Sequence, residues 1–107
     1  MSKEKEIHEI ERIKFSLEYH FQQYKDYKYE SQHASRKNDR NRAFDNMVTH
    51  ARYIECELNN PLVYSEICDG GQFQFEGFWK YVNSDLPGYL SKIESLLVKL
   101  KSEKQEE

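Results

Sequence analysis

The stretch that decides the fold is IHEIERIKFSLEYHFQQYKDYKY, residues 7–29. Apolar residues recur in it at steps of three and four, which places them on one side of an α-helix. Charged and amide side chains fill the positions between them, so the opposite side of the helix is solvated. Along the apolar stripe, isoleucine and leucine give way to tyrosine and phenylalanine. The pattern predicts one long amphipathic helix with an aromatic second half.

A second long helix is predicted to follow a short polar link and to end at about Leu58. Asn38 or Asp39 is expected as its N-cap, because a short side-chain acceptor binds the free N–H groups of a first helical turn. A short link between two long helices predicts an antiparallel hairpin. The apolar stripe of the second helix consists of Ala43, Phe44, Met47, Ala51, Ile54 and Leu58.

Residues 62–76 are compatible with two structures. Asn60 as N-cap, Pro61 at the first helical position and Gly70 past the end would describe a short helix. The pair Asp69-Gly70 and the alternation of residues 72–76 would instead describe a short β-hairpin. An isolated two-stranded hairpin is marginal in water, so the helix is favoured.

The end of the chain predicts two more helical segments. Residues 75–82 fit a short helix that ends at residues 83–85, and a last helix starts near Pro87. Its stripe consists of Leu86, Tyr89 or Leu90, Ile93, Leu96 or Leu97, and Leu100. We therefore expect an all-α, small helical bundle with three long helices and one or two short ones. It forms a single domain over residues 1–107, with frayed ends at about 1–4 and 102–107.

Composition limits both the core and the location of the protein. Hydrophobic residues make up 37% of the chain and aromatic residues 14%, so aromatic rings are expected to supply much of a small core. No apolar run approaches the roughly 20 residues that cross a bilayer, and the N-terminal stretch is charged, which predicts a cytoplasmic protein with no membrane association. Cys56 and Cys68 lack metal-type spacing and are expected to be free thiols.

The charge distribution and the aromatic content predict a protein-binding module that is not an enzyme. Residues 53–79 carry five negative and no positive charges, interleaved with aromatic residues. Such a surface suits the basic groove of a nucleic-acid-handling protein, as expected for an inhibitor, immunity or antitoxin-like protein. The residues predicted to contact this partner are Tyr64, Glu66, Asp69, Phe73, Phe75 and Glu76, together with Tyr24 and Tyr27 of the first helix.

Two alternatives stay open. The first is a self-associating helical module, a homodimer in which the long first stripe packs on its symmetry mate. The second is nucleic-acid binding by the basic turn, where cations near tyrosines resemble a single-strand site, although the net charge of −3 opposes it. The cations of this turn are Arg36, Lys37, Arg40 and Arg42.

One segment of the second helix resembles a known family. Asn41-Arg42-Ala43-Phe44, followed by Met47 and by Ala51-Arg52, is similar to the Asn-Arg-Ala-Tyr-Tyr-Ala-Met helix of HEPN-domain proteins. The resemblance implies a helical bundle of a family that often acts as RNA-cleaving toxins or as their partners. The active pair of that family is an Arg and a His that are closer in sequence than Arg42 and His50, which seven residues separate. The catalytic motif is therefore not matched.

Cofactor and metal chemistry are not expected. Glu30 and His33 have the Glu-x-x-His spacing of di-iron bundles, but those sites need a second copy of the motif, which the sequence does not contain. Gly70-Gly71 is a lone pair typical of a turn and is not a phosphate-binding loop.

Overall fold

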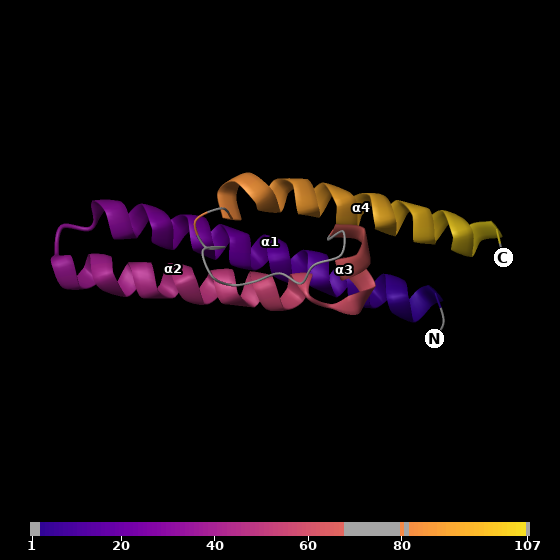
Figure 1. Cartoon of the computed structure of the whole chain (residues 1–107), viewed down its shortest axis with the longest axis horizontal. Coiled ribbons are helices and arrows are strands. Elements are labelled where there is room, and N and C mark those ends of the chain that lie inside the picture. The colour runs from indigo at the N-terminus through magenta and orange to yellow at the C-terminus, as the bar shows by residue number, and fades with distance from the viewer. Residues whose placement is uncertain (1–2, 68–79, 81, 107) are drawn as a thin grey trace.

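The computed structural model of the protein describes residues 3–67, 80 and 82–106. These residues form four α-helices and no strand, and the molecule measures 58 × 25 × 21 Å (Figure 1). The helices are α1 (Lys3–His33), α2 (Lys37–Leu58), α3 (Pro61–Ile67) and α4 (Val82–Glu106). The predicted all-α bundle of three long helices and a short one is confirmed. None of the described helices is long and apolar enough to cross a membrane.

Helices α1 and α2 form the predicted antiparallel hairpin (Figure 1). The prediction of Asn38 or Asp39 as N-cap is wrong, because α2 already begins at Lys37, and Arg36 in the N-cap position makes no side-chain capping bond. Instead, Arg40 Nη1 donates to the carbonyl oxygens of Ala34 at 2.8 Å and Ser35 at 3.3 Å. The guanidinium satisfies carbonyl groups of the turn that follows α1 and so stabilises this turn.

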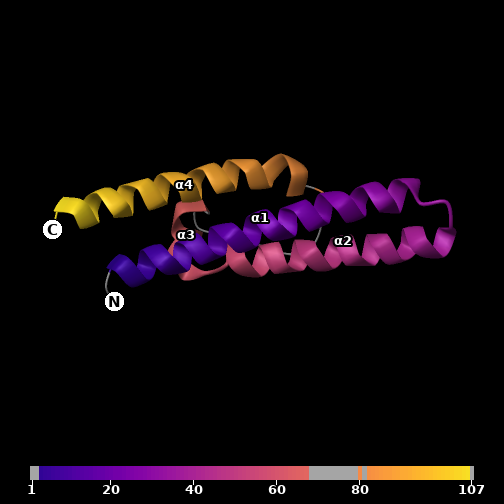
Figure 2. The same ribbon diagram turned by 180° about the vertical axis from the view of Figure 1, so that it is seen from behind.

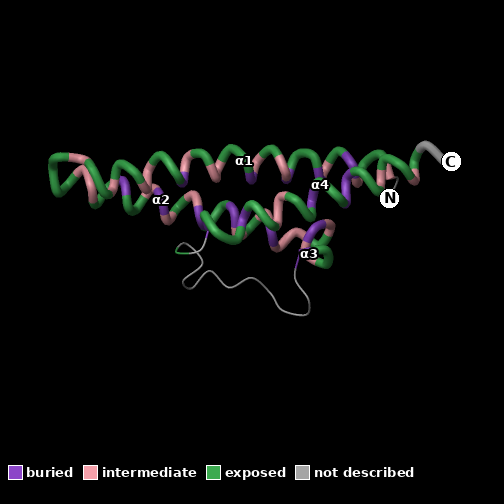
Figure 3. Tube along the Cα trace, turned by 90° about the horizontal axis from the view of Figure 1, so that it is seen from above, coloured by how far each residue is buried: buried purple, intermediate pink, exposed green. Residues whose placement is uncertain are grey.

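The core is a continuous aliphatic cluster along the facing sides of the helices (Figure 3). The predicted stripe of α1 supplies Ile7, Ile10, Ile13, Leu17 and Tyr24. Tyr24 is the one aromatic residue among the buried residues that the structure describes, and the partly buried rings of Phe21, Tyr27 and Tyr89 pack against the core. In this part of the chain, aromatic rings therefore contribute mainly at the edge of the core. Phe44 is also 39% exposed, because its neighbour Ala43 faces the core in its place.

Helix α3 begins as its sequence predicts. Asn60 Oδ1 accepts a hydrogen bond from the backbone N–H of Leu62 at 3.0 Å, and Pro61 occupies the first helical position. Residues 61–67 are therefore helical, and the start of the alternative β-hairpin is wrong there. The second half of that hairpin, residues 72–76, lies outside the described residues.

Helix α4 starts earlier than predicted. It begins at Val82 and runs through residues 83–85, so the break expected there is wrong, and Pro87 lies inside the helix. A proline close to a helix N-terminus removes few internal hydrogen bonds. Val82 and Leu86 are both fully buried, so their burial in the core stabilises this first turn. The helical backbone continues to Glu106, beyond Lys101, after which fraying was expected.

Helix α4 packs antiparallel to α1, along the half of α1 that begins at the N-terminus. Ion pairs mark this register, with Lys14 Nζ 3.1 Å from Glu94 and Lys101 Nζ 3.4 Å from Glu11. Beyond the start of α4, α1 and α2 extend together to the end of the molecule that carries their turn (Figures 1 and 2). The described part of the structure therefore has a covered half and a protruding two-helix half.

Candidate binding face of α1 and α2

Aromatic and histidine side chains gather where α1 and α2 lie side by side. Their spacing along each helix places them on one side of the hairpin, and their rings lie in contact with one another. We call this group the Tyr–His face, and it consists of Tyr19, His20, Tyr27, His50 and Tyr53.

Two imidazoles form the centre of the face. The Nδ1 atoms of His20 and His50 lie 2.8 Å apart, which is hydrogen-bond distance. Tyr53 stacks on the His20 ring with a centroid distance of 4.8 Å, and Tyr27 stacks on the His50 ring at 5.6 Å. Each imidazole is therefore oriented by a neighbouring ring as well as by the other histidine.

The face is wet at its edges and drier at its centre. Tyr19 is 46% exposed and Tyr53 51% exposed, whereas both histidines are half-buried. Burial lowers the pKa of His20, and the negative charge of Glu57 opposes this shift. Burial also lowers the pKa of His50, and the charge of His20 lowers it further. Both shifts favour neutral rings, which can donate and accept hydrogen bonds between them.

Charged groups at one end of the face are already paired. Arg12 donates from Nη2 to Glu9 at 2.8 Å and from Nη1 to Glu57 at 3.0 Å, the latter linking α1 to α2. Hydrogen bonds to these two carboxylates raise the pKa of Arg12. The end of the face nearest to Arg12 is consequently an internally neutralised network.

The residues predicted to contact a partner are not brought together in the described residues. Tyr24 is 1% exposed, and burial raises the pKa of its hydroxyl, so its ring belongs to the core. Tyr27 joins the Tyr–His face, whereas Tyr64 and Glu66 lie on α3. The remaining predicted contacts, Asp69, Phe73, Phe75 and Glu76, lie outside the described residues.

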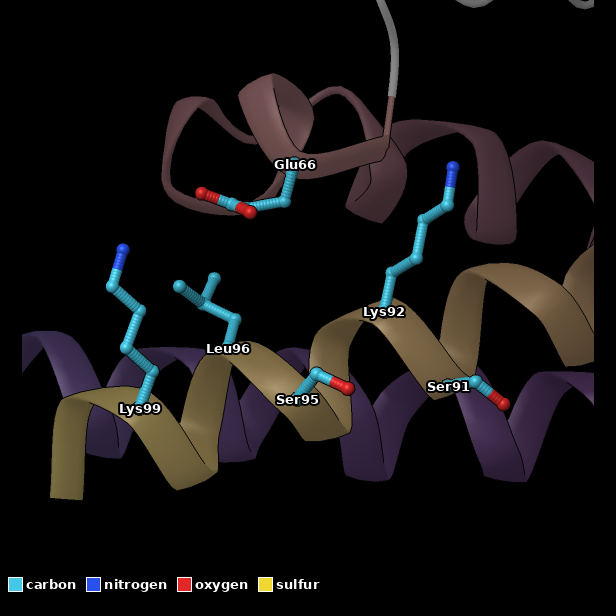
Figure 4. Close-up of a pocket in the computed structure, with 6 residues that line it drawn as sticks. All are labelled: Glu66, Ser91, Lys92, Ser95, Leu96 and Lys99. Carbon is cyan, nitrogen blue, oxygen red and sulfur yellow. The ribbon is translucent and has the colours of Figure 1, made fainter. Parts of the chain in front are cut away.

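Glu66 lies in a shallow groove of about 360 Å³ between α3 and α4. Figure 4 shows its carboxylate opposite Leu96, with Lys92 and Lys99 of α4 on either side. The nearby lysines offset part of the negative charge that the sequence assigned to this region. At Glu66, the surface is therefore of mixed charge.

The basic turn divides into a structural cation and exposed ones. Arg40 is part-buried and bonds to backbone carbonyls of the turn, whereas Arg36, Lys37 and Arg42 are exposed. A second groove, of about 380 Å³, runs beside Arg40 and is lined in part by Phe44. The sequence did not predict this division, because a cation bound to carbonyls has the same local sequence as a free one.

Metal chemistry has no support in the described residues. None of them form a group of three or more His, Cys, Asp and Glu side chains that could hold a metal ion. The ring of His33, from the Glu-x-x-His motif, packs on Tyr29 with a centroid distance of 4.2 Å. Cys56 is an exposed free thiol, and Cys68 lies outside the described residues.

Sequence reasoning missed the histidine pair, although the sequence contains a signal for it. In an antiparallel helical hairpin, residues equally distant from the turn lie opposite each other, because both helices rise equally per residue. His20 and His50 are equally distant from Ser35 in the turn, and they meet. Arg12 and Glu57, which also pair, follow almost the same register.

Comparison of the chain with protein-family models, curated proteins and solved structures finds no match. The resemblance to the HEPN helix thus remains confined to the residues that suggested it. The geometry adds that His50 Nδ1 faces His20.

Proposed function

We propose that this protein is a non-enzymatic protein-binding module whose contact surface is the Tyr–His face. The observation that carries the proposal is the combination of exposure and order at Tyr19 and Tyr53. Both rings are about half exposed, yet both pack against the imidazole of His20. Tyrosine is enriched at binding hot spots, and rings that are held in place before binding lose less conformational entropy.

The charges around the face favour a protein over a nucleic acid as the partner. A single-strand site needs cations that are free to meet phosphates beside its stacking rings. Arg12, the cation whose contacts border the face, is already bonded to two carboxylates. Arg40 in the basic turn is bonded to backbone carbonyls. The exposed cations of that turn, Arg36, Lys37 and Arg42, lie two helical turns or more from His50 along the chain. Aromatic rings with internally paired charges are better suited to an apolar protein surface with a polar rim.

The test compares two double variants of the full chain. Tyr19→Ala/Tyr53→Ala removes the exposed rings of the face, and Phe15→Ala/Tyr29→Ala removes two exposed rings of α1 outside it. A protein captured from the native host is purified, and its Kd for each variant is measured. We expect the first variant to bind at least about 30-fold more weakly and the control to bind within a few-fold of wild type.

Helical circular dichroism must stay unchanged in both variants for this comparison to count. Equal binding by the two variants would overturn the proposed surface, and the absence of any saturable protein partner would overturn the function. An inhibitor, immunity or antitoxin-like role follows if the partner is an enzyme whose turnover falls as the complex forms. A captured partner whose activity is unaffected would argue against that role.

Self-association is the second candidate, because Phe15 and Val98 are 76% and 60% exposed on the pair of helices α1 and α4. Exposed apolar side chains often mark contact surfaces. Light scattering at micromolar concentration separates the two candidates. A dimer that Phe15→Ser converts to a monomer would support self-association, and a wild-type monomer would exclude it at that concentration.

A further inference from the structure

The Nδ1-to-Nδ1 arrangement of His20 and His50 limits how many protons the pair can hold while its hydrogen bond persists. Two Nδ1 atoms 2.8 Å apart form a hydrogen bond only when one carries a proton and the other presents a lone pair. In the neutral pair, one ring is therefore the Nδ1–H tautomer and donates, and the other is the Nε2–H tautomer and accepts.

A first additional proton leaves this bond intact. It binds Nε2 of the donor ring, which becomes an imidazolium and still donates from Nδ1 to the neutral ring. The hydrogen bond is then charge-assisted and stronger. A second additional proton has one place to bind, the Nδ1 atom that accepts the bond. Two N–H groups and two positive charges would then face each other, so the rings must separate.

We propose that the His20–His50 pair is a one-proton clamp between α1 and α2, which holds the Tyr–His face together while at most one ring is charged and releases it when both are. Release must disturb the tyrosines, because Tyr53 stacks on one ring and Tyr27 on the other. Tyr19 also lies against both imidazoles, with centroid distances of 5.0 Å to His20 and 6.4 Å to His50.

The groups around the pair favour an unequal division of the protons. On α2, Glu57 acts on His20 with its negative charge, which favours His20 as the ring that charges first. On α1, Arg12 is bonded to Glu57 and moderates that attraction. Once His20 is charged, its own charge opposes a second proton on His50. Among the described residues, the phenol rings of Tyr19, Tyr27 and Tyr53 also lie against the pair.

The consequence for binding rests on the proposed function. If the Tyr–His face is the contact surface, acidification that charges both rings releases the partner by disordering Tyr19 and Tyr53. The clamp itself requires no partner, so it is tested on the free chain.

The experiment is an imidazole NMR titration of the full-length protein from neutral to mildly acidic pH. We expect one of the two rings to show the Nδ1–H tautomer at neutral pH. We further expect two separate protonation steps at least about one pH unit apart. The ring signals of Tyr19 and Tyr53 should change with the second step only. Two Nε2–H tautomers, or one shared protonation step, would overturn the clamp.

A variant makes the test specific. In His50→Asn, the amide oxygen takes the position of Nδ1, so it can still accept the bond but cannot be protonated. We expect the ring signals of Tyr19 and Tyr53 to stay unchanged through the pH range in which the wild type loses its order. His8→Asn, at an exposed histidine of α1, should retain the wild-type transition. Loss of tyrosine order in His50→Asn at the wild-type pH would overturn the clamp, whereas partner binding at neutral pH tests the proposed function separately.

Discussion

Helix α1 has two sides that are built from different residues. Towards α4 it presents aliphatic side chains flanked by ion pairs, such as Lys14 with Glu94 and Glu11 with Lys101. Towards α2 it also presents aromatic rings and His20, which pairs with His50 of α2. The aliphatic core includes residues of both α2 and α4, whereas Tyr19 on α1 and Tyr53 on α2 stay about half exposed.

This difference separates the residues that stabilise the fold from the residues that stay accessible to a partner. Aliphatic residues contribute most when they are fully removed from water, and such residues cannot also contact a partner. A tyrosine can stay partly exposed at a smaller cost in stability, because its hydroxyl is then hydrated. A single helix can therefore contribute a core along one side and a contact surface along another.

The largest expected change in the free energy of unfolding comes from a substitution in the aliphatic core. Leu17 is fully buried and Phe15, two residues earlier on the same helix, is 76% exposed. Leu17→Ala should lower the free energy of unfolding by about 2–5 kcal/mol through lost transfer energy and a residual cavity. Phe15→Ala should change it by less than about 0.5 kcal/mol. Urea unfolding followed by circular dichroism measures both, and similar losses would show that α1 is not divided in this way.

The next prediction concerns the pH dependence of stability that arises from the Tyr–His face. Burial lowers the pKa of both His20 and His50, so below the unfolded value of about 6.5 the unfolded chain binds more protons than the folded one. Stability is thus highest above that pH and is lost as the pH falls toward the lower folded values. Both rings are half-buried and keep part of their hydration, so we expect a modest loss of about 1 kcal/mol or less.

Carboxylates titrate in the same range, so the measure is the difference between variants. Urea unfolding of His50→Asn should lose less stability than wild type between about pH 8 and pH 5. His8→Asn should lose as much as wild type. An identical loss in all three proteins would mean that the pair contributes nothing to the pH dependence.

The sequence predicted the two long helices of the hairpin well, because their apolar residues repeat with the helical period over many turns. Local signals failed where tertiary contacts decided the outcome. Pro87 marked a helix start, yet burial of Val82 moves that start upstream. Asn38 and Asp39 favoured capping, yet Arg40 closes the turn with a side chain that no capping rule includes.

The site was less predictable than the fold. Aromatic and acidic residues were expected to act together because they are close in sequence, whereas the structure gathers rings from α1 and α2 across a hairpin. His20 and His50 have no local motif in common. Their contact depends on the register of α2 against α1, which a shift of the turn by one residue would change. A position for the turn was needed before the pair could be recognised.

The smallest expected effect compares the two sides of α1 through their ion pairs. Arg12 binds Glu57 through two guanidinium nitrogens, at 3.0 and 3.2 Å, whereas Lys14 contacts Glu94 through a single ammonium at 3.1 Å. Two-point bonding fixes the geometry of the Arg12 pair, and Glu57 is only 18% exposed. We expect a coupling of up to about 1 kcal/mol for Arg12 with Glu57 and about 0.3 kcal/mol for Lys14 with Glu94, since both pairs are partly exposed to solvent.

Double-mutant cycles with alanine, followed by urea unfolding, measure these couplings at low and high salt. Both couplings should weaken at about 1 M salt, where the Debye length is roughly 3 Å. The Arg12–Glu57 pair should keep the larger fraction of its coupling, because the carboxylate of Glu57 is less exposed than that of Glu94. A larger coupling for Lys14 with Glu94 would place the stronger electrostatic link on the α4 side. The α2 side would then be held mainly by its rings.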